Sequence, residues 1–220
     1  MQNHRTVFVC QGTGCLSSGS GAVYDALKAE VARQGLRNAS IEISGCHGHG
    51  LCEHGPSVTV EPEGIFYIHV QAEDADEIVR SHLRDGKPVE RLFYRDPATN
   101  KAIPYYSEIN FYKKQQRIIL RNCGRINPEK IDHYIGQGGY RALRKVFLMS
   151  PEEVIEEIKK VGLRGRGGAG FPTGRKWEFC RKAQENKKYV ICNADEGDPG
   201  AFMDRSILEA DPHSVIEGLT

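Results

Sequence analysis

Four of the seven cysteines form two pairs whose spacing suits a metal centre. Cys10 and Cys15 are spaced C-x4-C after a β-rich run, and Cys46 and Cys52 are spaced C-x5-C after a second one. Thiolates from two glycine-rich loops can hold zinc or an iron–sulfur cluster. Zinc favours spacings from C-x2-C to C-x4-C, and the sequence has no redox C-x-x-C pair. The pairs therefore predict a metal centre, either an iron–sulfur cluster, which the spacing favours, or zinc, with simple burial of the cysteines as the alternative.

A second candidate site is the segment GLRGRGGAGFPTGRKWEF, residues 162–179. Its glycines leave the backbone free to present N–H groups to an anion, and cationic side chains surround them. The G-x-G-x-x-G pattern at residues 165–170 follows a predicted helix, whereas the Rossmann motif follows a strand. Flexible linkers carry Ser and Thr rather than interleaved Arg, Phe and Trp. The segment is thus predicted to bind the phosphate of a nucleotide or flavin by a loop of non-Rossmann type.

The third candidate is the acidic segment NADEGDPG, residues 193–200. It follows a predicted strand at residues 189–192, and α/β proteins place ligands at such strand ends. A solvated acidic turn or a divalent-metal loop is the alternative, although the spacing does not match an EF-hand. Taken alone, this segment leaves both interpretations open.

Two groups of predicted elements would position these residues. In residues 6–84 the order is βαβββα, which predicts a thioredoxin-like fold with a hairpin turn at residues 61–64. Ser150, Pro151 and Glu153 form a capping box that opens a helix, and another helix is predicted at residues 175–183. A short helical pair is predicted at residues 131–147. The strands of the first group are predicted at 6–10, 39–44, 57–60 and 65–70, and its helices at 22–32 and 75–83.

Composition sets limits on function. The chain has 220 residues and a formal net charge of +1, which predicts no general affinity for nucleic acid or membranes. Neither a run long enough for a membrane helix nor a signal peptide is seen in it. The odd cysteine number predicts a reducing, cytoplasmic setting. The chain ends directly after the helix-like DPHSVIEGL, so we expect a part of a longer subunit.

The cysteine-containing region resembles the thioredoxin-like 2Fe–2S ferredoxins, whose ligands are a C-x4-C pair and a later pair usually spaced C-x3-C. The resemblance implies Cys10, Cys15 and Cys46 as ligands. Cys52 becomes the fourth ligand if residues 47–50 contain a two-residue insertion, and the following E-H-G-P agrees with the family pattern. His47 or His49 is the alternative fourth ligand.

The two later segments, GRGGAGFPTGRKW and NADEGDPGAFMDR, resemble the FMN- and NADH-binding flavoprotein subunit of respiratory complex I. The same family includes beta subunits of NAD(P)-linked hydrogenases and formate dehydrogenases. RNCGRINPEKIDHYIGQGGYRAL is typical of the hydrogenase branch. The resemblance covers residues 110–220, and the whole chain is similar to the N-terminal portion of an electron-bifurcating hydrogenase beta subunit. It implies an α/β protein with a 2Fe–2S domain at 1–86, a linker at 87–130 and a partial FMN- and NAD(H)-binding domain at 131–220.

Residue roles follow from the resemblance by position. Arg166 lies near the flavin and Lys176 contacts it, while Phe171 and Phe179 stack on the adenine end of NADH. Asn193 and Asp195 contact the ribityl and phosphate region, and Glu196, the candidate catalytic residue, faces the nicotinamide. The glycines that line FMN and the nicotinamide nucleotide are Gly165, Gly167, Gly168 and Gly170.

The implied function is hydride transfer between NAD(P)H and FMN, with electrons relayed through a 2Fe–2S cluster. The implied partners are a hydrogenase or formate dehydrogenase catalytic subunit and a small ferredoxin-like subunit, without nucleic acid. A 4Fe–4S cluster is expected only in a family region outside this sequence. The alternatives are a non-catalytic 2Fe–2S electron-transfer module and a structural zinc-binding domain. NAD versus NADP and electron bifurcation stay open.

Overall fold

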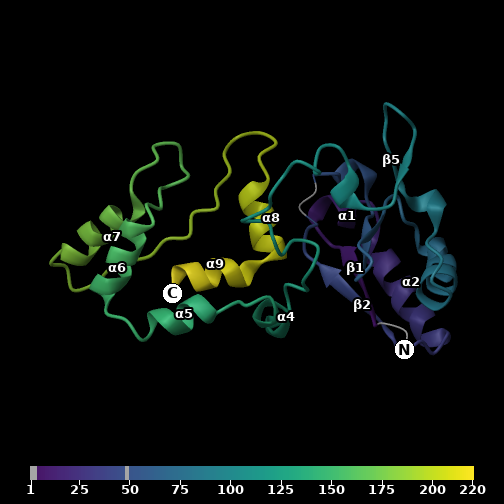
Figure 1. The fold of residues 1–220 in the computed structure, drawn as a ribbon, viewed down its shortest axis with the longest axis horizontal. Coiled ribbons are helices and arrows are strands. Elements are labelled where there is room, and N and C mark those ends of the chain that lie inside the picture. Colours follow the sequence, from purple (N-terminus) through teal and green to yellow (C-terminus); the bar gives the residue numbers. More distant parts are fainter. Residues whose placement is uncertain (1–3, 48–49) are drawn as a thin grey trace. The chain divides into compact units, whose positions relative to one another are not determined.

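The computed structural model describes residues 4–47 and 50–220, which divide into two compact units (Figure 1). The first unit combines Met1–Gln137 with Asp195–Val215. The second combines Gly138–Ala194 with Ile216–Thr220. These spatial units do not coincide with the expected limits at residues 86 and 130, which stay a prediction about domains.

The first unit is built on a four-stranded sheet in the order β2-β1-β3-β4. Strand β1 runs parallel to β2 and antiparallel to β3, and β3 and β4 form an antiparallel hairpin. Two helices, α1 and α2, join the parallel pair. This is the thioredoxin-like arrangement, so the predicted βαβββα order is confirmed. The bounds are β1 Arg5–Cys10, α1 Thr13–Ser17, α2 Ser20–Arg33, β2 Ala39–Ser44, β3 Val58–Glu61 and β4 Ile65–Tyr67.

One face of this sheet is covered by helices. Val7 and Val9 of β1 point to this face because alternate strand residues share a side. They form one buried cluster with Leu27 of α2 and with Ile78 and Leu83 of the following helical stretch. That stretch consists of η2 Ala72–Asp74, α3 Ala75–Glu77 and the π-helical η3 Ile78–Arg84. The helix predicted at residues 75–83 is therefore present, and most of it is π-helical.

The opposite face of the sheet is also buried. Phe66 of β4 packs there with Tyr94, Ile109 and Tyr112, which come from the segment expected to be a polar linker. That segment is a folded cover, so the ferredoxin-like sheet is shielded on both sides. Its elements are η4 Glu90–Leu92, β5 Tyr94–Arg95, β6 Ala102–Ile103 and η5 Tyr106–Glu108.

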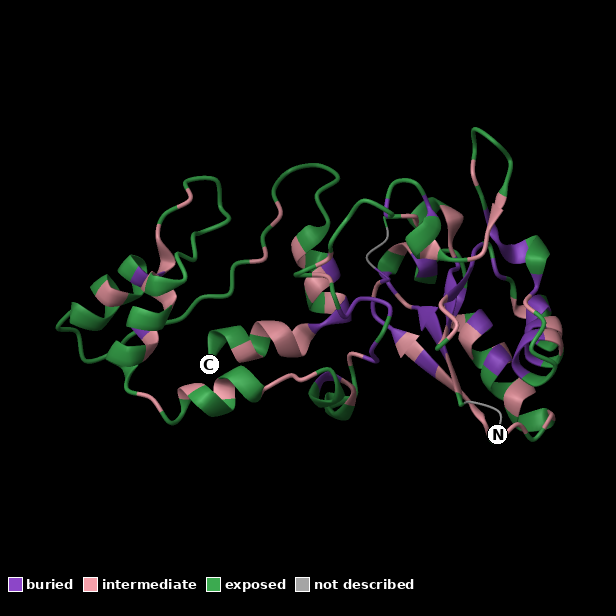
Figure 2. Cartoon of the chain, viewed as in Figure 1, coloured by how far each residue is buried: buried purple, intermediate pink, exposed green. Residues whose placement is uncertain are grey.

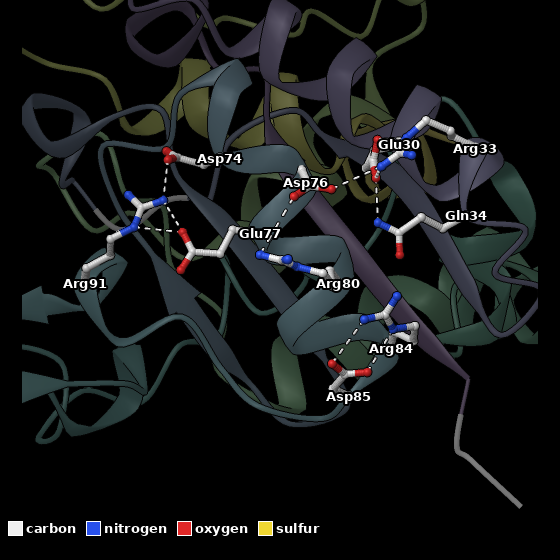
Figure 3. A network of polar contacts seen from close by, with 10 residues as sticks. All are labelled: Glu30, Arg33, Gln34, Asp74, Asp76, Glu77, Arg80, Arg84, Asp85 and Arg91. Carbon is white, nitrogen blue, oxygen red and sulfur yellow. Dashed lines mark hydrogen bonds and ion pairs between the residues drawn. The ribbon is translucent and has the colours of Figure 1, made fainter.

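Several ion pairs lie on the outer side of the helical layer (Figure 3). Arg33 of α2 reaches Asp76 at 3.1 Å, and Arg91 reaches Asp74 at 2.6 Å. The arginine side chains are about half exposed or more, so each pair adds little stability. They help to align α2 and the helical stretch rather than hold the core.

Buried polar contacts hold residues 195–215 in the first unit. These residues contain α8 Met203–Ala210 and the first part of α9 Pro212–Leu219, whose last residues belong to the second unit. The Asn122 side-chain amide donates to the Asp211 carboxylate at 2.7 Å, and both residues are buried. His213 stacks on Tyr134 of α4 Ile131–Gly136, with ring centroids 5.6 Å apart. The hydrogen bond from Asn122 offsets the cost of burying the Asp211 carboxylate.

The second unit contains α5 Arg141–Val146, α6 Pro151–Lys160 and α7 Thr173–Lys182. The predicted capping box is present, because Ser150 and Glu153 bond reciprocally at the start of α6. Helices α6 and α7 approach closely at Gly174, where an added Cβ would lie 2.8 Å from the Lys159 backbone nitrogen. Figure 2 shows that α6 and α7 are mostly exposed, whereas buried residues gather in the first unit.

The strand predicted at residues 189–192 is wrong. The segment is irregular, and Val190 and Ile191 are 75% and 82% exposed. A strand requires a neighbour that pairs with its N–H and C=O groups, and no strand in the described part of the chain pairs with this one. Among the described residues, no helix has both the length and the hydropathy to cross a bilayer.

Candidate functional site

The four predicted ligand cysteines line one pocket in the first unit. Cys10 is the last residue of β1, and Cys15 lies in α1. Cys46 follows β2, and Cys52 begins η1 Cys52–His54. Because β1 and β2 are parallel and Cys10 is paired with Ser44, the two cysteine loops leave the same edge of the sheet. The structure thus brings all four thiols together, and their role as ligands stays a prediction.

Glycines keep side chains out of this pocket. A Cβ added to Gly55 would lie 2.9 Å from the Cys15 sulfur, and one added to Gly14 would lie 3.0 Å from the Cys52 Cβ. Real Cβ atoms essentially never approach another atom as closely as 2.9 Å, and 3.0 Å is tighter than nine in ten real Cβ contacts. Larger residues at Gly55 and Gly14 would therefore press against Cys15 and Cys52. The glycine-lined space is what a compact inorganic cluster needs around its ligands.

Hydrogen bonds prepare one thiol for deprotonation. The Cys10 side chain lowers the pKa of Cys15 to about 6, and the backbone and hydroxyl of Ser57 act in the same direction. The pKa of Cys10 is raised, first by its bond with Cys15 and then by burial. Burial also raises the pKa of Cys52, with Cys46 and Cys15 adding to the effect. Metal ligation requires thiolates, so the pair at Cys10 and Cys15 is poised to release a proton on binding.

The four thiols match the donor set of an iron–sulfur centre. A 2Fe–2S cluster takes two ligands at each of two irons. The four cysteines that line this pocket supply that number of thiolates, so the donor set fits a 2Fe–2S cluster.

His47 forms part of the pocket wall beside the cysteines. It is 2% exposed, its Nδ1 lies 2.9 Å from the Ser57 hydroxyl, and burial lowers its pKa to about 3. Its carbonyl accepts a hydrogen bond from Arg117 at 3.1 Å, and the Arg117 guanidinium lies over the ring of Tyr106. His49, the other alternative ligand, lies outside the described residues. Ser57 and Arg117 support the second cysteine loop, and sequence spacing did not indicate either of them.

The glycine-rich loop of the second unit is closed at its base. Gly165 N–H donates to the Phe171 carbonyl at 2.9 Å, and Thr173 N–H donates to Leu163 at 2.9 Å. The Arg164 guanidinium donates to the Gly170 carbonyl at 2.6 Å. Gly170 has a φ of +58°, which an L side chain rarely adopts. The predicted helix–loop–helix is thus present, and its tip, including Arg166, is exposed.

Aromatic and cationic side chains lie at the end of this loop and on α7. Phe171 and Phe179 are 45% and 54% exposed, and their ring centroids lie 6.4 Å apart. The Arg175 guanidinium lies 5.8 Å from the centre of the Phe179 ring, and Lys176 is exposed. The second unit therefore brings the loop glycines, both phenylalanines and Lys176 into one neighbourhood.

The acidic segment is divided between the units. Asn193 belongs to the second unit, whereas Asp195 and Glu196 belong to the first. The Glu196 carboxylate accepts hydrogen bonds from the backbone N–H groups of Asp204 at 2.9 Å and Arg205 at 3.2 Å. These bonds, that of Asp204 foremost, lower the pKa of Glu196. Glu196 therefore caps the N-terminus of α8, and its assignment to the nicotinamide stays a prediction.

Helix α8 supplies pocket residues that sequence analysis missed. Phe202, Arg205, Ser206 and Glu209 line the same pocket as the four cysteines. Cys46 and Ser206 are 160 positions apart, so no spacing pattern could have connected them.

Comparison with known proteins places these features in a family context. A family model described as the Nuo51 FMN-binding domain matches residues 158–220. The NADP-reducing hydrogenase subunit HndC of Solidesulfovibrio fructosivorans is 59% identical over 107 residues, which is 49% of this chain and 22% of that protein. An NADH-quinone oxidoreductase subunit of Aquifex aeolicus is 51% identical over 102 residues, which is 46% of this chain and 24% of that protein.

One relative aligns with nearly the whole chain. The NAD-reducing hydrogenase HoxS subunit alpha of Cupriavidus necator is 32% identical over 226 aligned residues, covering 97% of this chain and 34% of that protein. Among solved structures, a thioredoxin-like 2Fe–2S ferredoxin from Aquifex aeolicus is 36% identical, with a TM-score of 0.39, covering 41% of this chain and 90% of that one. An NAD+-reducing NiFe-hydrogenase is 21% identical, with a TM-score of 0.36. The alignment covers 99% of this chain and 35% of that one.

The chain spans between about a fifth and about a third of the length of these curated relatives. Their names cover hydrogenases that reduce NAD or NADP and NADH-quinone oxidoreductases. The predicted relationship is therefore confirmed: residues 158–220 match the Nuo51 FMN-binding domain model, and the chain is similar to subunits of NADH-quinone oxidoreductases and of NAD- or NADP-reducing hydrogenases.

Proposed function

We propose that this chain is the N-terminal part of an NAD(P)H-oxidising flavoprotein module of a multisubunit oxidoreductase, of hydrogenase or formate dehydrogenase type. The observation that carries the proposal is the glycine-lined pocket with four cysteines, in a chain whose residues 158–220 match an FMN-binding family. Bound FMN would exchange a hydride with NAD(P)H and pass electrons singly to a 2Fe–2S cluster.

The second unit would bind the nucleotides through its glycine-rich loop. Exposed N–H groups at the tip of the loop, residues 166–169, would donate to phosphate oxygens, and the positive charges of Arg166 and Lys176 would strengthen those bonds. Phe171 and Phe179 would stack on the adenine. Because the tip of this loop is exposed, its backbone N–H groups are accessible to a phosphate.

The acidic segment would supply further contacts to the cofactors. Asn193 and Asp195 would contact the ribityl and phosphate region, and Glu196 would face the nicotinamide. Because its carboxylate accepts two backbone hydrogen bonds, Glu196 stays ionised and oriented. We assign it an orienting role, since an anion with a lowered pKa is a weak proton acceptor.

The first unit would hold the cluster through Cys10, Cys15, Cys46 and Cys52. We propose residues 1–86 as the ferredoxin domain, residues 87–130 as its connecting cover, and residues 131–220 as the beginning of the flavin domain. The partners would be a hydrogenase or formate dehydrogenase catalytic subunit and a small ferredoxin-like subunit, in the cytoplasm. The relatives' names, which describe subunits of such enzymes, support this assignment.

Absorption spectra before and after anaerobic addition of NADH or NADPH test this proposal. We expect flavin bands over a broad cluster absorption, and bleaching of the flavin bands by one of the two nucleotides. Bleaching by only one nucleotide would also decide between NAD and NADP. A colourless protein that contains zinc would contradict the proposal.

A non-catalytic 2Fe–2S electron-transfer module is the second candidate. One observation favours it: the cluster residues all lie in one unit, whereas the flavin residues are divided between two. A cluster spectrum without flavin bands, in protein supplied with excess FMN, would select this candidate.

A further inference from the structure

Helix α8 contacts both cysteine loops of the first unit. The Cys46 sulfur lies 3.8 Å from the Ser206 hydroxyl oxygen. In the other loop, the Thr13 hydroxyl donates to the Glu209 carboxylate at 3.0 Å. The same carboxylate oxygen accepts from the Arg205 guanidinium at 2.9 Å. One helix thus bridges the segment between Cys10 and Cys15 and the segment that carries Cys46.

Close packing holds α8 in this position. A Cβ added to Gly45, the residue before Cys46, would lie 1.5 Å from the Glu209 carbonyl oxygen. Ser206 and Ala210 are buried, and Asp211 directly after the helix is anchored by the buried amide of Asn122. The second cysteine loop therefore has a glycine where the helix backbone passes.

The residues that α8 presents are those that tune iron–sulfur clusters. The reduction potential of a cluster depends on net charge, on hydrogen bonds to sulfur and on solvent exposure. Arg205 adds a cation to the pocket, Ser206 adds a hydroxyl next to Cys46, and Phe202 adds apolar cover.

We infer that α8 is a wall of the 2Fe–2S site, in which Ser206 and Arg205 are positioning residues that set the reduction potential of the cluster. The inference rests on the proposed function, because it requires that the four cysteines hold a cluster. It goes beyond that function in one respect: α8, which lies in the segment that matches the FMN-binding family, would act on the cluster held by the cysteines of the ferredoxin-like region.

The hydroxyl of Ser206 has one proton and two acceptors. It donates to the Phe202 carbonyl at 2.7 Å, while the Cys46 thiol donates to the Ser206 oxygen. A ligating Cys46 has lost its proton, so its sulfur becomes a second acceptor that competes with the Phe202 carbonyl for a hydrogen bond from Ser206. Such a bond strengthens when the cluster gains an electron, and it therefore raises the reduction potential.

Arg205 and Glu209 act in opposite directions. Reduction adds a negative charge to the cluster, so the Arg205 cation favours the reduced form and the Glu209 anion disfavours it. Their ion pair at 2.9 Å balances the two effects. Removing one member exposes the charge of the other, which predicts potential shifts of opposite sign.

A redox titration followed by electron paramagnetic resonance of the reduced cluster tests this inference in the full chain. At the midpoint of the unmodified protein, we expect Arg205→Gln to lower the ratio of reduced to oxidised cluster about tenfold, which corresponds to about 59 mV for one electron. Glu209→Gln should raise that ratio, and Ser206→Ala should lower it. Arg80→Gln, which breaks another i,i+4 pair with Asp76, is the matched control and should leave the ratio unchanged.

Thiol alkylation of the metal-free protein gives a second readout. We expect Gly45→Ala to displace α8 and to increase the alkylation rate of Cys46 severalfold. Gly21→Ala is the matched control, because an added Cβ there meets no atom within 4 Å. If Gly45→Ala does not fold, the potentials of Arg205→Gln and Glu209→Gln still decide the question.

The outcomes separate this inference from the proposed function. Unmodified protein without iron and sulfide after reconstitution would contradict the proposed function, and the inference would fail with it. A cluster whose potential is the same in Arg205→Gln, Glu209→Gln and the Arg80→Gln control would overturn the inference alone. Shifts of the same sign for Arg205→Gln and Glu209→Gln would also overturn it, because charge could not then be the cause.

Discussion

The cysteine pocket and the glycine-rich loop differ in how much of each site the protein itself organises. The pocket lies at the edge of a sheet that is buried on both faces, and buried polar contacts surround its thiols. The loop is organised only at its base, and its tip is exposed. A cluster held by covalent metal–sulfur bonds needs ligands at set positions, whereas a phosphate needs donors that no protein acceptor has already taken. The two regions thus show two degrees of preorganisation.

Removal of a predicted ligand should have the largest effect. We expect it to abolish the cluster in the cysteine pocket and to leave the glycine-rich loop unchanged. We expect Cys15→Ala to lose the cluster almost completely, since a 2Fe–2S centre needs two protein ligands at each iron and alanine supplies none. Cys180→Ala, at an exposed position on α7, should keep it. Iron and sulfide analysis after reconstitution measures the difference. A full cluster in Cys15→Ala would show that another side chain replaces this ligand.

Acid should destabilise the first unit through a buried histidine. The His82 Nδ1 is hydrogen-bonded to the Tyr67 hydroxyl at 2.8 Å, and burial lowers the pKa of His82 from 6.5 to about 4. The unfolded chain therefore binds more protons between these pH values, so stability falls as the pH drops from 6.5 to 4. The loss at pH 4 should reach about 3 kcal/mol.

Urea unfolding of the first unit, followed by circular dichroism across this pH range, measures that loss. Other buried groups titrate as well, and His47 is one of them. His82→Gln therefore serves as the reference, because only the His82 contribution disappears in it. An equal pH dependence in both proteins would contradict the assignment to His82.

The second unit should respond to changes at the contact between α6 and α7. A methyl group at Gly174 would lie 2.6 Å from the Lys159 Cγ and 2.8 Å from its backbone nitrogen. We expect Gly174→Ala to lower the unfolding free energy of this unit by about 2 kcal/mol through overpacking. The single tryptophan, Trp177, lies on α7 and reports on this unit by fluorescence.

Gly167→Ala is the control for that substitution, because an added Cβ there meets no atom within 4 Å. Coincident shifts of the Trp177 transition and of the His82-dependent transition would show that the two units unfold together. Separate transitions would confirm that preorganisation and stability are set independently in the two regions.

Much of the local structure could be predicted because it depends on neighbours in sequence. The capping box at Ser150, the turn at residues 61–64 and the βαβββα order all follow from short-range patterns. The convergence of the cysteine loops depends on the parallel pairing of β1 and β2, because parallel strands end at the same edge of a sheet. The prediction of a strand at residues 189–192 was wrong, because β-rich composition cannot show whether a pairing partner exists.

The sequence by itself determined the chemistry of this protein: four thiols in two loops, a basic glycine-rich loop and an acidic segment. The tertiary structure decided which of these groups meet. It placed Tyr94, Ile109 and Tyr112 over the second face of the sheet, turned Glu196 onto the N-terminus of α8, and set Ser206 beside Cys46. Contacts across 160 positions arise from packing and hydrogen bonding between complete elements, and no local spacing encodes them.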